Sequence, residues 1–254
     1  MTSDSVENEQ TILFISDLHL CEARSQTTRA FLGFLDGPAL KASRLYILGD
    51  LFEYWAGDDD ATDFKVLIAD ALKTLANAGV RVLFMAGNRD FLLGPSYAAR
   101  AGLELIEDPF ELRLAERRYL LTHGDQLCTD DLAYQAFRGQ VRNHAWQQAF
   151  LARPLQERRQ LVEDIRARSE SAKRLKASDI MDVNSGAVEG LLRDHDYPTL
   201  IHGHTHRPAW HEHVVDNRRC TRVVLEDWDA TAPYLEWSAG ALHNRTYIPE
   251  TAVR

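Results

Sequence analysis

The stretch Thr11-Ile-Leu-Phe-Ile-Ser-Asp-Leu-His-Leu20 gives the first indication of the fold. Its apolar part, from Thr11 to Ser16, has the length of a β-strand and is bounded by polar residues, so we predict a buried strand. Asp17 and His19 follow at the carboxyl end of this strand. Because α/β proteins bind ligands at the carboxyl ends of their strands, we expect functional side chains at the neighbouring strand ends as well.

The first third of the chain alternates strand-like and helical patterns. Helices are predicted over Thr27–Asp36 and from about Asp63 to Ala78, where Gly79 ends the second one. Further strands are predicted over Leu45–Leu48 and Val80–Phe84. This β-α-β-α-β order favours a mostly parallel sheet that is covered on both faces.

The remaining two thirds are predicted to contain a long helical region between groups of strands. The helical region extends from about Asp130 to Ser171 and is broken near Pro154. The predicted strands cover Phe110–Leu114, Tyr119–Thr122 and Pro198–His202, and a later β-rich run includes Val214–Val215, Thr221–Leu225 and Tyr234–Trp237. We therefore predict one α/β domain over residues 1–254, with a helical insertion at about 130–178.

The composition is that of a soluble globular protein. Of the 254 residues, 45% are hydrophobic and 26% are charged, which argues against disorder. No window approaches the roughly 20 apolar residues of a membrane-spanning helix, and the polar start lacks the apolar core of a secretory signal, so we expect a cytoplasmic protein. Cys21, Cys128 and Cys220 form no CxxC pair, which favours reduced thiols.

The charge is unevenly distributed along the chain. The formal net charge of −9 argues against general binding of nucleic acid. The segment from Arg138 to Lys176 is an exception, because it has ten Lys or Arg residues against four Asp or Glu residues. This segment therefore carries +6, and the rest of the chain carries −15.

Polar side chains follow five of the predicted strands, and glycines beside them allow close approach of the backbone. The five strand ends are Ser16-Asp17-Leu18-His19, Leu48-Gly49-Asp50, Ala86-Gly87-Asn88-Arg89-Asp90, Leu121-Thr122-His123-Gly124-Asp125 and Ile201-His202-Gly203-His204-Thr205-His206. Any one motif alone is more often a capped turn or a histidine of the core. Five in succession indicate a metal centre, and their carboxylate, imidazole and amide groups suit manganese, iron or zinc better than calcium.

Seven of these residues are the candidate ligands of two divalent ions. We predict one ion at Asp17, His19 and His206, a second at Asn88, His123 and His204, and Asp50 as a bridge between them. Two ions about 3.5 to 4 Å apart could share a hydroxide and clamp a phosphate during in-line attack. His202 is left out because strand alternation points it away from the site.

The motifs Asp17-x-His19, Gly49-Asp50-x-x-Glu53, Gly87-Asn88-x-Asp90, His123 and Gly203-His204-x-His206 resemble the calcineurin-like metallophosphoesterase superfamily over residues 11 to 210. The resemblance implies a four-layer α/β/β/α sandwich and agrees with the ligand assignments. Arg89 departs from it, because the superfamily usually has a histidine there. A phosphate leaving group has little need of that general acid, and arginine could bind phosphoryl oxygens instead. Alternatively, Arg89 only pairs with Asp90 or another nearby carboxylate.

Longer strings, such as Gly49-Asp-Leu-Phe-Glu-Tyr-Trp55 and His123-Gly-Asp-Gln-Leu-Cys-Thr-Asp-Asp131, are similar to one branch of this superfamily, the pyrophosphatases of lipid A biosynthesis. That resemblance implies hydrolysis of a lipid-linked UDP-sugar into UMP and a sugar 1-phosphate, with two divalent ions, most often Mn²⁺. It implies substrate contacts by Asn88, Arg89, Asp131, Ser169, Lys173, Lys176 and His204. We expect a monomer that is attached peripherally to the cytoplasmic face of the inner membrane.

The basic segment lies between two metal motifs and is predicted to form a lid over them. Apolar residues four apart, such as Trp146 and Phe150, indicate helices with one apolar and one basic face. Such a lid could hold acyl chains and meet anionic headgroups. Alternatively, the stripe only packs the helices together and the charges are solvated. Two other functions stay open, namely a phosphoesterase for a soluble nucleotide or phosphoprotein and a metal-free scaffold.

Overall fold

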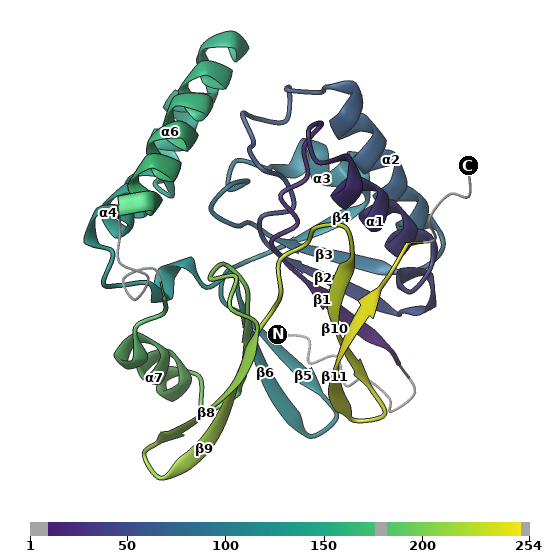
Figure 1. Ribbon diagram of the computed structural model, residues 1–254, viewed down its shortest axis with the longest axis vertical. Coiled ribbons are helices and arrows are strands. Elements are labelled where there is room, and N and C mark those ends of the chain that lie inside the picture. The colour runs from purple at the N-terminus through teal and green to yellow at the C-terminus, as the bar shows by residue number, and fades with distance from the viewer. Residues whose placement is uncertain (1–9, 176–181, 250–254) are drawn as a thin grey trace.

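Two β-sheets form the centre of the molecule in the computed structural model, which describes residues 10–175 and 182–249 and, over 168–175, the backbone alone (Figure 1). The first sheet has six strands in the order β11-β10-β1-β2-β3-β4. These strands are β1 (Ile12–Ile15), β2 (Arg44–Leu48), β3 (Arg81–Met85), β4 (Leu103–Ile106), β10 (Ala232–Ser238) and β11 (Ala241–Tyr247). β1 to β4 are parallel, and β10 runs antiparallel to both β1 and β11.

The second sheet has five strands in the order β5-β6-β7-β9-β8. They are β5 (Phe110–Leu114), β6 (Arg117–Thr122), β7 (Thr199–His202), β8 (Ala209–Val215) and β9 (Arg218–Val224). β6, β7 and β9 are parallel, whereas the edge strands β5 and β8 run antiparallel to their neighbours. The adjacent parallel strands β1, β2 and β3 of the first sheet and β6, β7 and β9 of the second can bring their carboxyl ends to a common rim.

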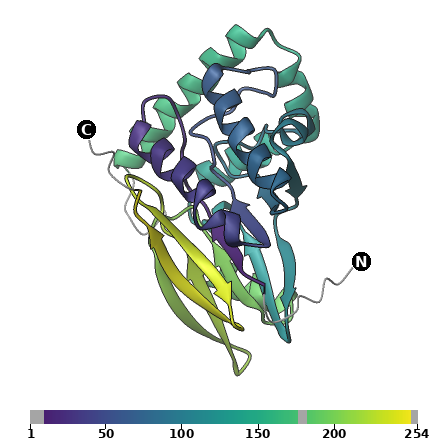
Figure 2. The ribbon, with the colours of Figure 1, turned by 90° about the vertical axis from the view of Figure 1, so that its right-hand side faces the viewer.

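Helices cover the outer faces of the two sheets (Figures 1 and 2). The first sheet packs against α1 (Ser25–Asp36), α2 (Asp63–Asn77) and α3 (Pro95–Ala101), and the second sheet packs against α7 (Ser185–Asp194). Two short 3-10 helices are η1 (Ala39–Lys41) and η2 (Asp125–Leu127). The layers are therefore helix, sheet, sheet and helix, which confirms the predicted four-layer sandwich.

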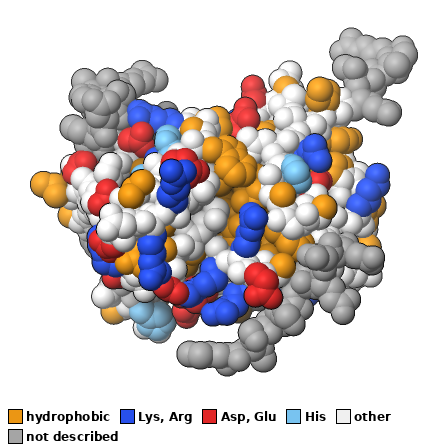
Figure 3. Space-filling model, turned by 90° about the horizontal axis from the view of Figure 1, so that it is seen from below, with side chains coloured by type: hydrophobic (Ala, Val, Ile, Leu, Met, Phe, Trp, Pro, Cys, Tyr) orange, Lys and Arg blue, Asp and Glu red, His pale blue; other side chains and the backbone are white. Residues whose placement is uncertain are grey.

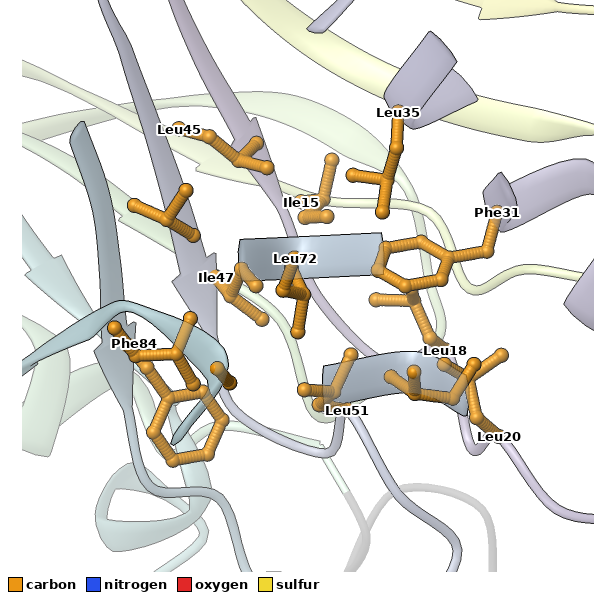
Figure 4. Packing of buried hydrophobic residues seen from close by; sticks show 14 of the residues in the cluster. Ile15, Leu18, Leu20, Phe31, Leu35, Leu45, Ile47, Leu51, Leu72 and Phe84 are labelled. Atoms are coloured by element: carbon orange, nitrogen blue, oxygen red, sulfur yellow. The ribbon is translucent and has the colours of Figure 1, made fainter. Parts of the chain in front are cut away.

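Three apolar layers hold this sandwich together. Successive residues of β1 point to opposite faces, so Leu13 and Ile15 pack under the helices while Ile12 and Phe14 pack between the sheets. Figure 4 shows side chains of the first layer, including Ile15, Phe31, Leu72 and Phe84, pointing toward one another from strands and helices. β1 is buried on both faces, which explains why its sequence is an uninterrupted apolar run.

The helical insertion consists of three helices rather than the predicted long region with one break. They are α4 (Leu132–Val141), α5 (His144–Leu151) and α6 (Leu155–Leu175). The break near Pro154 is confirmed, and a second break falls at Asn143, whose side chain accepts a hydrogen bond from the backbone N–H of Trp146 and caps α5. α4 and α6 lie on the side of the molecule toward which β1, β2 and β3 run (Figure 1).

Charged residues of both signs alternate on the opposite end of the sandwich. Seen from below in Figure 3, hydrophobic side chains form a strip across the middle of this face, with acidic and basic side chains on either side. Near the turn between β8 and β9, Nε and Nη2 of Arg193 donate to the two carboxylate oxygens of Asp216. Within residues 10–175 and 182–249, no helix combines the length and apolarity that crossing a membrane requires.

Candidate metal centre

The five predicted strand ends meet at one rim that is shared by the two sheets. β1, β2 and β3 of the first sheet and β6 and β7 of the second sheet place all seven candidate ligands there. Five of these residues have a positive φ, between 50° and 66°, namely Asp17, His19, Asp50, His204 and His206. Residues other than glycine rarely adopt this conformation, and its repetition at one rim marks a functional site.

Glycines let the turns at this rim approach one another. A Cβ atom on Gly87 would lie 2.2 Å from Oδ1 and 2.4 Å from the backbone N of Asp50. A Cβ atom on Gly203 would lie 2.1 Å from Oδ2 of Asp17. Both distances are far below van der Waals contact, so only glycine fits at these positions without displacing a candidate ligand.

Asp17, His19 and His206 form the first group of candidate ligands. Nε2 of His206 lies 3.3 Å from Nε2 of His19 and 3.4 Å from Oδ1 of Asp17. Oδ2 of Asp17 accepts hydrogen bonds from Oγ of Ser16 and the backbone N–H of His204. Oδ1 of Asp17 is buried and accepts none within the described part of the chain. A buried oxygen that faces two imidazoles without a donor fits a bound cation.

Asn88, His123 and His204 form the second group. Oδ1 of Asn88 lies 2.9 Å from Nε2 of His123 and 2.8 Å from Nδ1 of His204. Nδ1 of His123 donates to the carbonyl oxygen of Leu48, so the neutral ring has its lone pair on Nε2, which faces Asn88. With the amide oxygen of Asn88 turned toward this lone pair, both atoms face a place where a cation would be held.

The electric field at this rim favours a cation. His123 is buried, which by itself lowers its pKa, but the carboxylates of Asp50, Asp17 and Asp125 raise the pKa of His123 to about 9. Burial likewise raises the pKa of Asp17, yet the nearby imidazoles of His206, His123 and His19 hold it well below its usual range. Clustered carboxylates that stabilise a positive charge in a buried site are suited to a divalent metal.

Asp50 lies between the two groups. Its Oδ2 is 3.9 Å from Nε2 of His19, and its Oδ1 is 3.7 Å from Nε2 of His123. The backbone N–H of Arg89 donates to Oδ1 of Asp50 and holds the carboxylate in this orientation. The predicted bridging residue is therefore positioned to face both groups.

Asp90 has a role that the sequence did not reveal. Its buried carboxylate accepts hydrogen bonds from four backbone N–H groups, which belong to Gly87, Asp50, Leu51 and Phe52. Burial raises the pKa of Asp90 to about 6, and the neighbouring charge of Asp50 adds to this rise. Asp90 clamps the turn after β2 to the turn after β3, and so it positions Asp50 relative to Asn88.

Besides Asn88 and His204, two more of the predicted substrate contacts, Arg89 and Asp131, have protein partners. Nη1 of Arg89 lies 3.9 Å from Oε1 of Glu53, so the carboxylate near Arg89 is Glu53 rather than Asp90. Asp131 caps α4 by accepting a hydrogen bond from the backbone N–H of Tyr134. Of the other predicted contacts, Ser169 and Lys173 lie in the part of α6 where only the backbone is described, and Lys176 lies outside the described residues.

His202 does not join the ligands. It is fully buried, with Nδ1 against the carbonyl oxygen of Gly203 and Nε2 near the guanidinium of Arg222. Burial, opposed by the hydrogen bond to Gly203 and assisted by the charge of Arg222, lowers the pKa of His202 to about 4. The structure thus places this histidine in the packing of the second sheet, as strand alternation predicted.

The basic residues of the insertion bind the body of the protein. Nε of Arg138 lies 2.8 Å from Oδ2 of Asp125, and Arg142 donates to the backbone carbonyls of Ala86 and Gly87 beside Asn88. On α6, the pairs are Arg158 with Asp59, Arg159 with Asp60 and Arg166 with Glu53. These five arginines pair with the body of the protein, and the contact of the segment with anionic headgroups stays a prediction.

The apolar side of the insertion also contacts the body. Trp146 stacks on Phe150, with ring centroids 5.1 Å apart, and lies against Phe91. Leu161 and Val162 of α6 pack against the core cluster beneath α1 to α3. The helices α4 to α6 are therefore seated beside the metal centre by both apolar packing and ion pairs.

Comparison with known proteins identifies the class of this protein. The family model of the calcineurin-like phosphoesterases matches residues 10–208, which contain all seven candidate ligands. The chain therefore belongs to the calcineurin-like phosphoesterase family, as its motifs predicted. Residues 10–208 also contain the strand ends that hold all the candidate ligands of the two-sheet sandwich.

Individual relatives narrow the similarity further. A protein of Aromatoleum aromaticum named UDP-2,3-diacylglucosamine hydrolase is 62% identical over 89% of this chain and 92% of its own length. Proteins with the same name from Chromohalobacter salexigens and Cellvibrio japonicus are 46% and 48% identical, over 86% and 92% of this chain and 89% and 98% of their own lengths. The resemblance to the lipid A branch of the family is thereby confirmed.

Proposed function

We propose that this protein hydrolyses the pyrophosphate bond of UDP-2,3-diacylglucosamine and releases UMP and 2,3-diacylglucosamine 1-phosphate. The observation that carries the proposal is the convergence of seven oxygen and nitrogen donors from five strand ends, in a chain that is 62% identical to a protein named for this substrate. A phosphoester cleaved without a covalent enzyme intermediate requires an activated water and compensation of phosphoryl charge, both of which such a centre supplies.

In this proposal two divalent ions occupy the centre, and we propose Mn²⁺ because the ligand set suits it and the family resemblance implies it. One is held by Asp17, His19 and His206, the other by Asn88, His123 and His204, with Asp50 between them. When bound, they supply Lewis acidity toward the phosphoryl oxygens and lower the pKa of a water. The hydrogen bond from Nδ1 of His123 to the carbonyl oxygen of Leu48 would keep the lone pair on Nε2 turned toward the ion.

Arg89, Asn88 and His204 would bind the pyrophosphate. Arg89 follows Asn88 directly, and its side chain is 13% exposed, which leaves its fixed charge partly desolvated beside the site. Such a charge attracts phosphoryl oxygens more strongly than an exposed one. The leaving phosphate is a weak base, so a histidine acid is not needed at this position. Asp131, Ser169, Lys173 and Lys176 are proposed to contact the sugar, phosphates or nucleotide.

The acyl chains are proposed to lie along the lid. Leu132 at the start of α4 and Leu151 at the end of α5 are exposed, with 77% and 40% of their surface accessible. Apolar side chains with this exposure offer contact to a lipid that a soluble nucleotide does not need. A reaction that requires the acyl chains of the substrate would therefore distinguish this proposal from a phosphoesterase that acts on a soluble substrate.

Hydrolysis of UDP-2,3-diacylglucosamine, with Mn²⁺ or a chelator, tests this function. We expect UMP release that depends on Mn²⁺, that falls by at least about 100-fold in Asn88→Ala, and that is not seen with deacylated UDP-glucosamine. Equal activity on the deacylated compound would favour a soluble substrate. Activity on neither compound by protein shown to bind Mn²⁺ would rule out the proposed reaction.

We also propose a monomer at the cytoplasmic face of the inner membrane that contacts anionic lipid peripherally. Arg153, between α5 and α6, is exposed and lies near the exposed Leu151, which would place one basic and one apolar side chain at the membrane surface. Sedimentation with anionic and with neutral vesicles tests this contact, and light scattering tests the mass. Equal binding to both vesicle types, or to neither, contradicts an electrostatic attachment.

A further inference from the structure

Glu53 connects the metal centre to the lid. It lies three residues beyond Asp50 in the loop after β2, and only 8% of its surface is exposed. Oε2 of Glu53 lies 3.2 Å from Nδ1 of His19. Oε1 of the same carboxylate lies 2.9 Å from Nε of Arg166 on α6 and 3.9 Å from Nη1 of Arg89. One buried carboxylate therefore faces a candidate ligand on one side and two arginines on the other.

The contact with Glu53 determines how His19 presents its ring. A carboxylate beside Nδ1 favours the tautomer with its proton on Nδ1, which leaves the lone pair on Nε2. Nε2 of His19 is the atom that faces His206 and Asp50. The guanidinium groups of Arg166 and Arg89 lie on the other side of the Glu53 carboxylate, so Glu53 can orient the ring by charge as well as by contact.

Arg166 reaches Glu53 because α6 is seated on the body. Two turns earlier in the helix, Arg159 pairs with the buried Asp60, and Arg158 donates to the carbonyl of Ala56. Arg159 and Arg166 are seven residues apart and so lie on the same side of the helix. A displacement of α6 that breaks these contacts would also take the guanidinium of Arg166 away from Glu53.

We propose that Glu53 is a positioning residue that couples the seating of lid helix α6 to the binding of a divalent ion by Asp17, His19 and His206. The inference rests on the proposed metal centre. An ion on Nε2 makes the Nδ1 proton of His19 a stronger donor and so strengthens its interaction with Glu53. Arg166 holds the same carboxylate in place only while α6 is seated. Because coupling is reciprocal, a seated lid raises the affinity of the site for the ion, and the bound ion stabilises the seated position of the lid.

Binding of Mn²⁺ to the full chain without substrate, measured by titration calorimetry and by the spin-resonance signal of free Mn²⁺, tests the inference. We expect Glu53→Gln to weaken the binding of one of two Mn²⁺ ions by about 10- to 100-fold and to leave the affinity for the other nearly unchanged. Arg166→Gln should lower the affinity for the same ion by about 5-fold or more. Glu53→Asp, which keeps the charge but shortens the reach, should fall between Glu53→Gln and the unaltered chain.

Arg100→Gln is the control for the loss of a partly exposed ion pair, because Arg100 of α3 pairs with Asp70 of α2 and its side chain is 48% exposed, against 40% for Arg166. This pair attaches neither α6 nor Glu53. Hydrogen exchange of the α6 amides gives the reciprocal readout, and we expect Mn²⁺ to slow it in the unaltered chain but not in Glu53→Gln. Circular dichroism establishes that each variant is folded.

Unchanged Mn²⁺ affinity in Arg166→Gln, or an equal loss in Arg100→Gln, would overturn the coupling while the metal centre stands. No Mn²⁺ binding by the unaltered chain would overturn both. The choice of substrate does not enter this measurement, so a wrong substrate in the proposed function leaves its outcome unaffected.

Discussion

Single residues at the rim are arranged for a cation rather than for the stability of the chain. Positive φ angles, a conformation that costs free energy for residues with a Cβ atom, occur at Asp17, His19, Asp50, His204 and His206. Oδ1 of Asp17 is buried without a donor in the described structure, which costs further. Such costs persist in a folded protein when the strained residues perform a function, here the proposed binding of metal.

We expect Gly87→Ala to remove metal binding and to lower the free energy of unfolding by about 1–3 kcal/mol. The added methyl group would lie 2.4 Å from the backbone N of Asp50, which cannot move while Asp90 holds it by hydrogen bonds. Mn²⁺ titration and urea unfolding measure the two effects.

Gly190→Ala is the control for that substitution. Gly190 lies within α7, and a Cβ atom there would meet no atom within 4 Å. This change should leave Mn²⁺ binding intact and stabilise the chain by about 0.5–1 kcal/mol, because alanine favours a helix over glycine. Normal metal affinity in Gly87→Ala would show that the turns after β2 and β3 do not need their close approach.

At the scale of elements, the attachment of α6 depends on a buried ion pair beneath it. Asp60 and Lys65 are 1% and 4% exposed, and Arg159 of α6 pairs with the same aspartate. Burial lowers the pKa of Lys65 despite its partner, whereas for Asp60 the hydrogen bonds from Lys65 and Arg159 outweigh burial and lower the pKa. Desolvation of the ammonium is therefore the larger cost, and the pair adds little net stability.

We expect Asp60→Asn to lower the free energy of unfolding by about 3 kcal/mol, because it leaves the ammonium of Lys65 buried without a charged partner. It should also speed hydrogen exchange at the start of α6, where Arg159 loses its carboxylate. Urea unfolding and hydrogen exchange measure these effects.

The double variant Asp60→Asn with Lys65→Met separates the two causes. Removing both charges should restore most of the stability, because no buried charge is left unpaired, while exchange at α6 stays fast. A double variant as unstable as Asp60→Asn would mean that packing around Asp60, and not the buried charge of Lys65, causes the loss.

At the scale of the whole molecule, the candidate ligands join the two sheets. Asp17, Asp50 and Asn88 follow strands of the first sheet, whereas His123 and His204 follow strands of the second. The layer between the sheets is otherwise apolar, with Phe14, Tyr46 and Trp237 among its buried side chains. Bound ions would therefore act as a crosslink at one end of an apolar interface.

We expect Mn²⁺ at 100 times its dissociation constant to stabilise the fold by about 2.7 kcal/mol, which corresponds to a rise in Tm of about 5–10 °C for a chain of this length. Chelator should reverse this rise. Thermal unfolding monitored by circular dichroism measures it.

Asn88→Ala tests the origin of this stabilisation, since its side chain faces His123 and His204 from the other sheet. Its Tm should rise less with Mn²⁺ than that of the unaltered chain. An equal rise in both proteins would place the ions away from the proposed centre.

Local patterns in the sequence were sufficient for most elements and for the seven candidate ligands. β1, β2 and β3 were predicted because each is a short apolar run, and their ligands because each run ends in glycine or polar residues within a few positions. α3, β4, α7 and β11 were missed. Each is short and lies beside loops, so its weak periodicity does not separate it from irregular structure.

The sequence by itself thus determined the order of strands and helices and which residues end each strand, because these depend on side-chain periodicity and on turns between near neighbours. Only the tertiary structure decided that Asp90 clamps two turns, that Glu53 contacts both His19 and Arg166, and that Arg158 and Arg159 of α6 pair with the body. Those contacts join residues up to 113 positions apart, and no local pattern specifies which distant charges a fold will bring together.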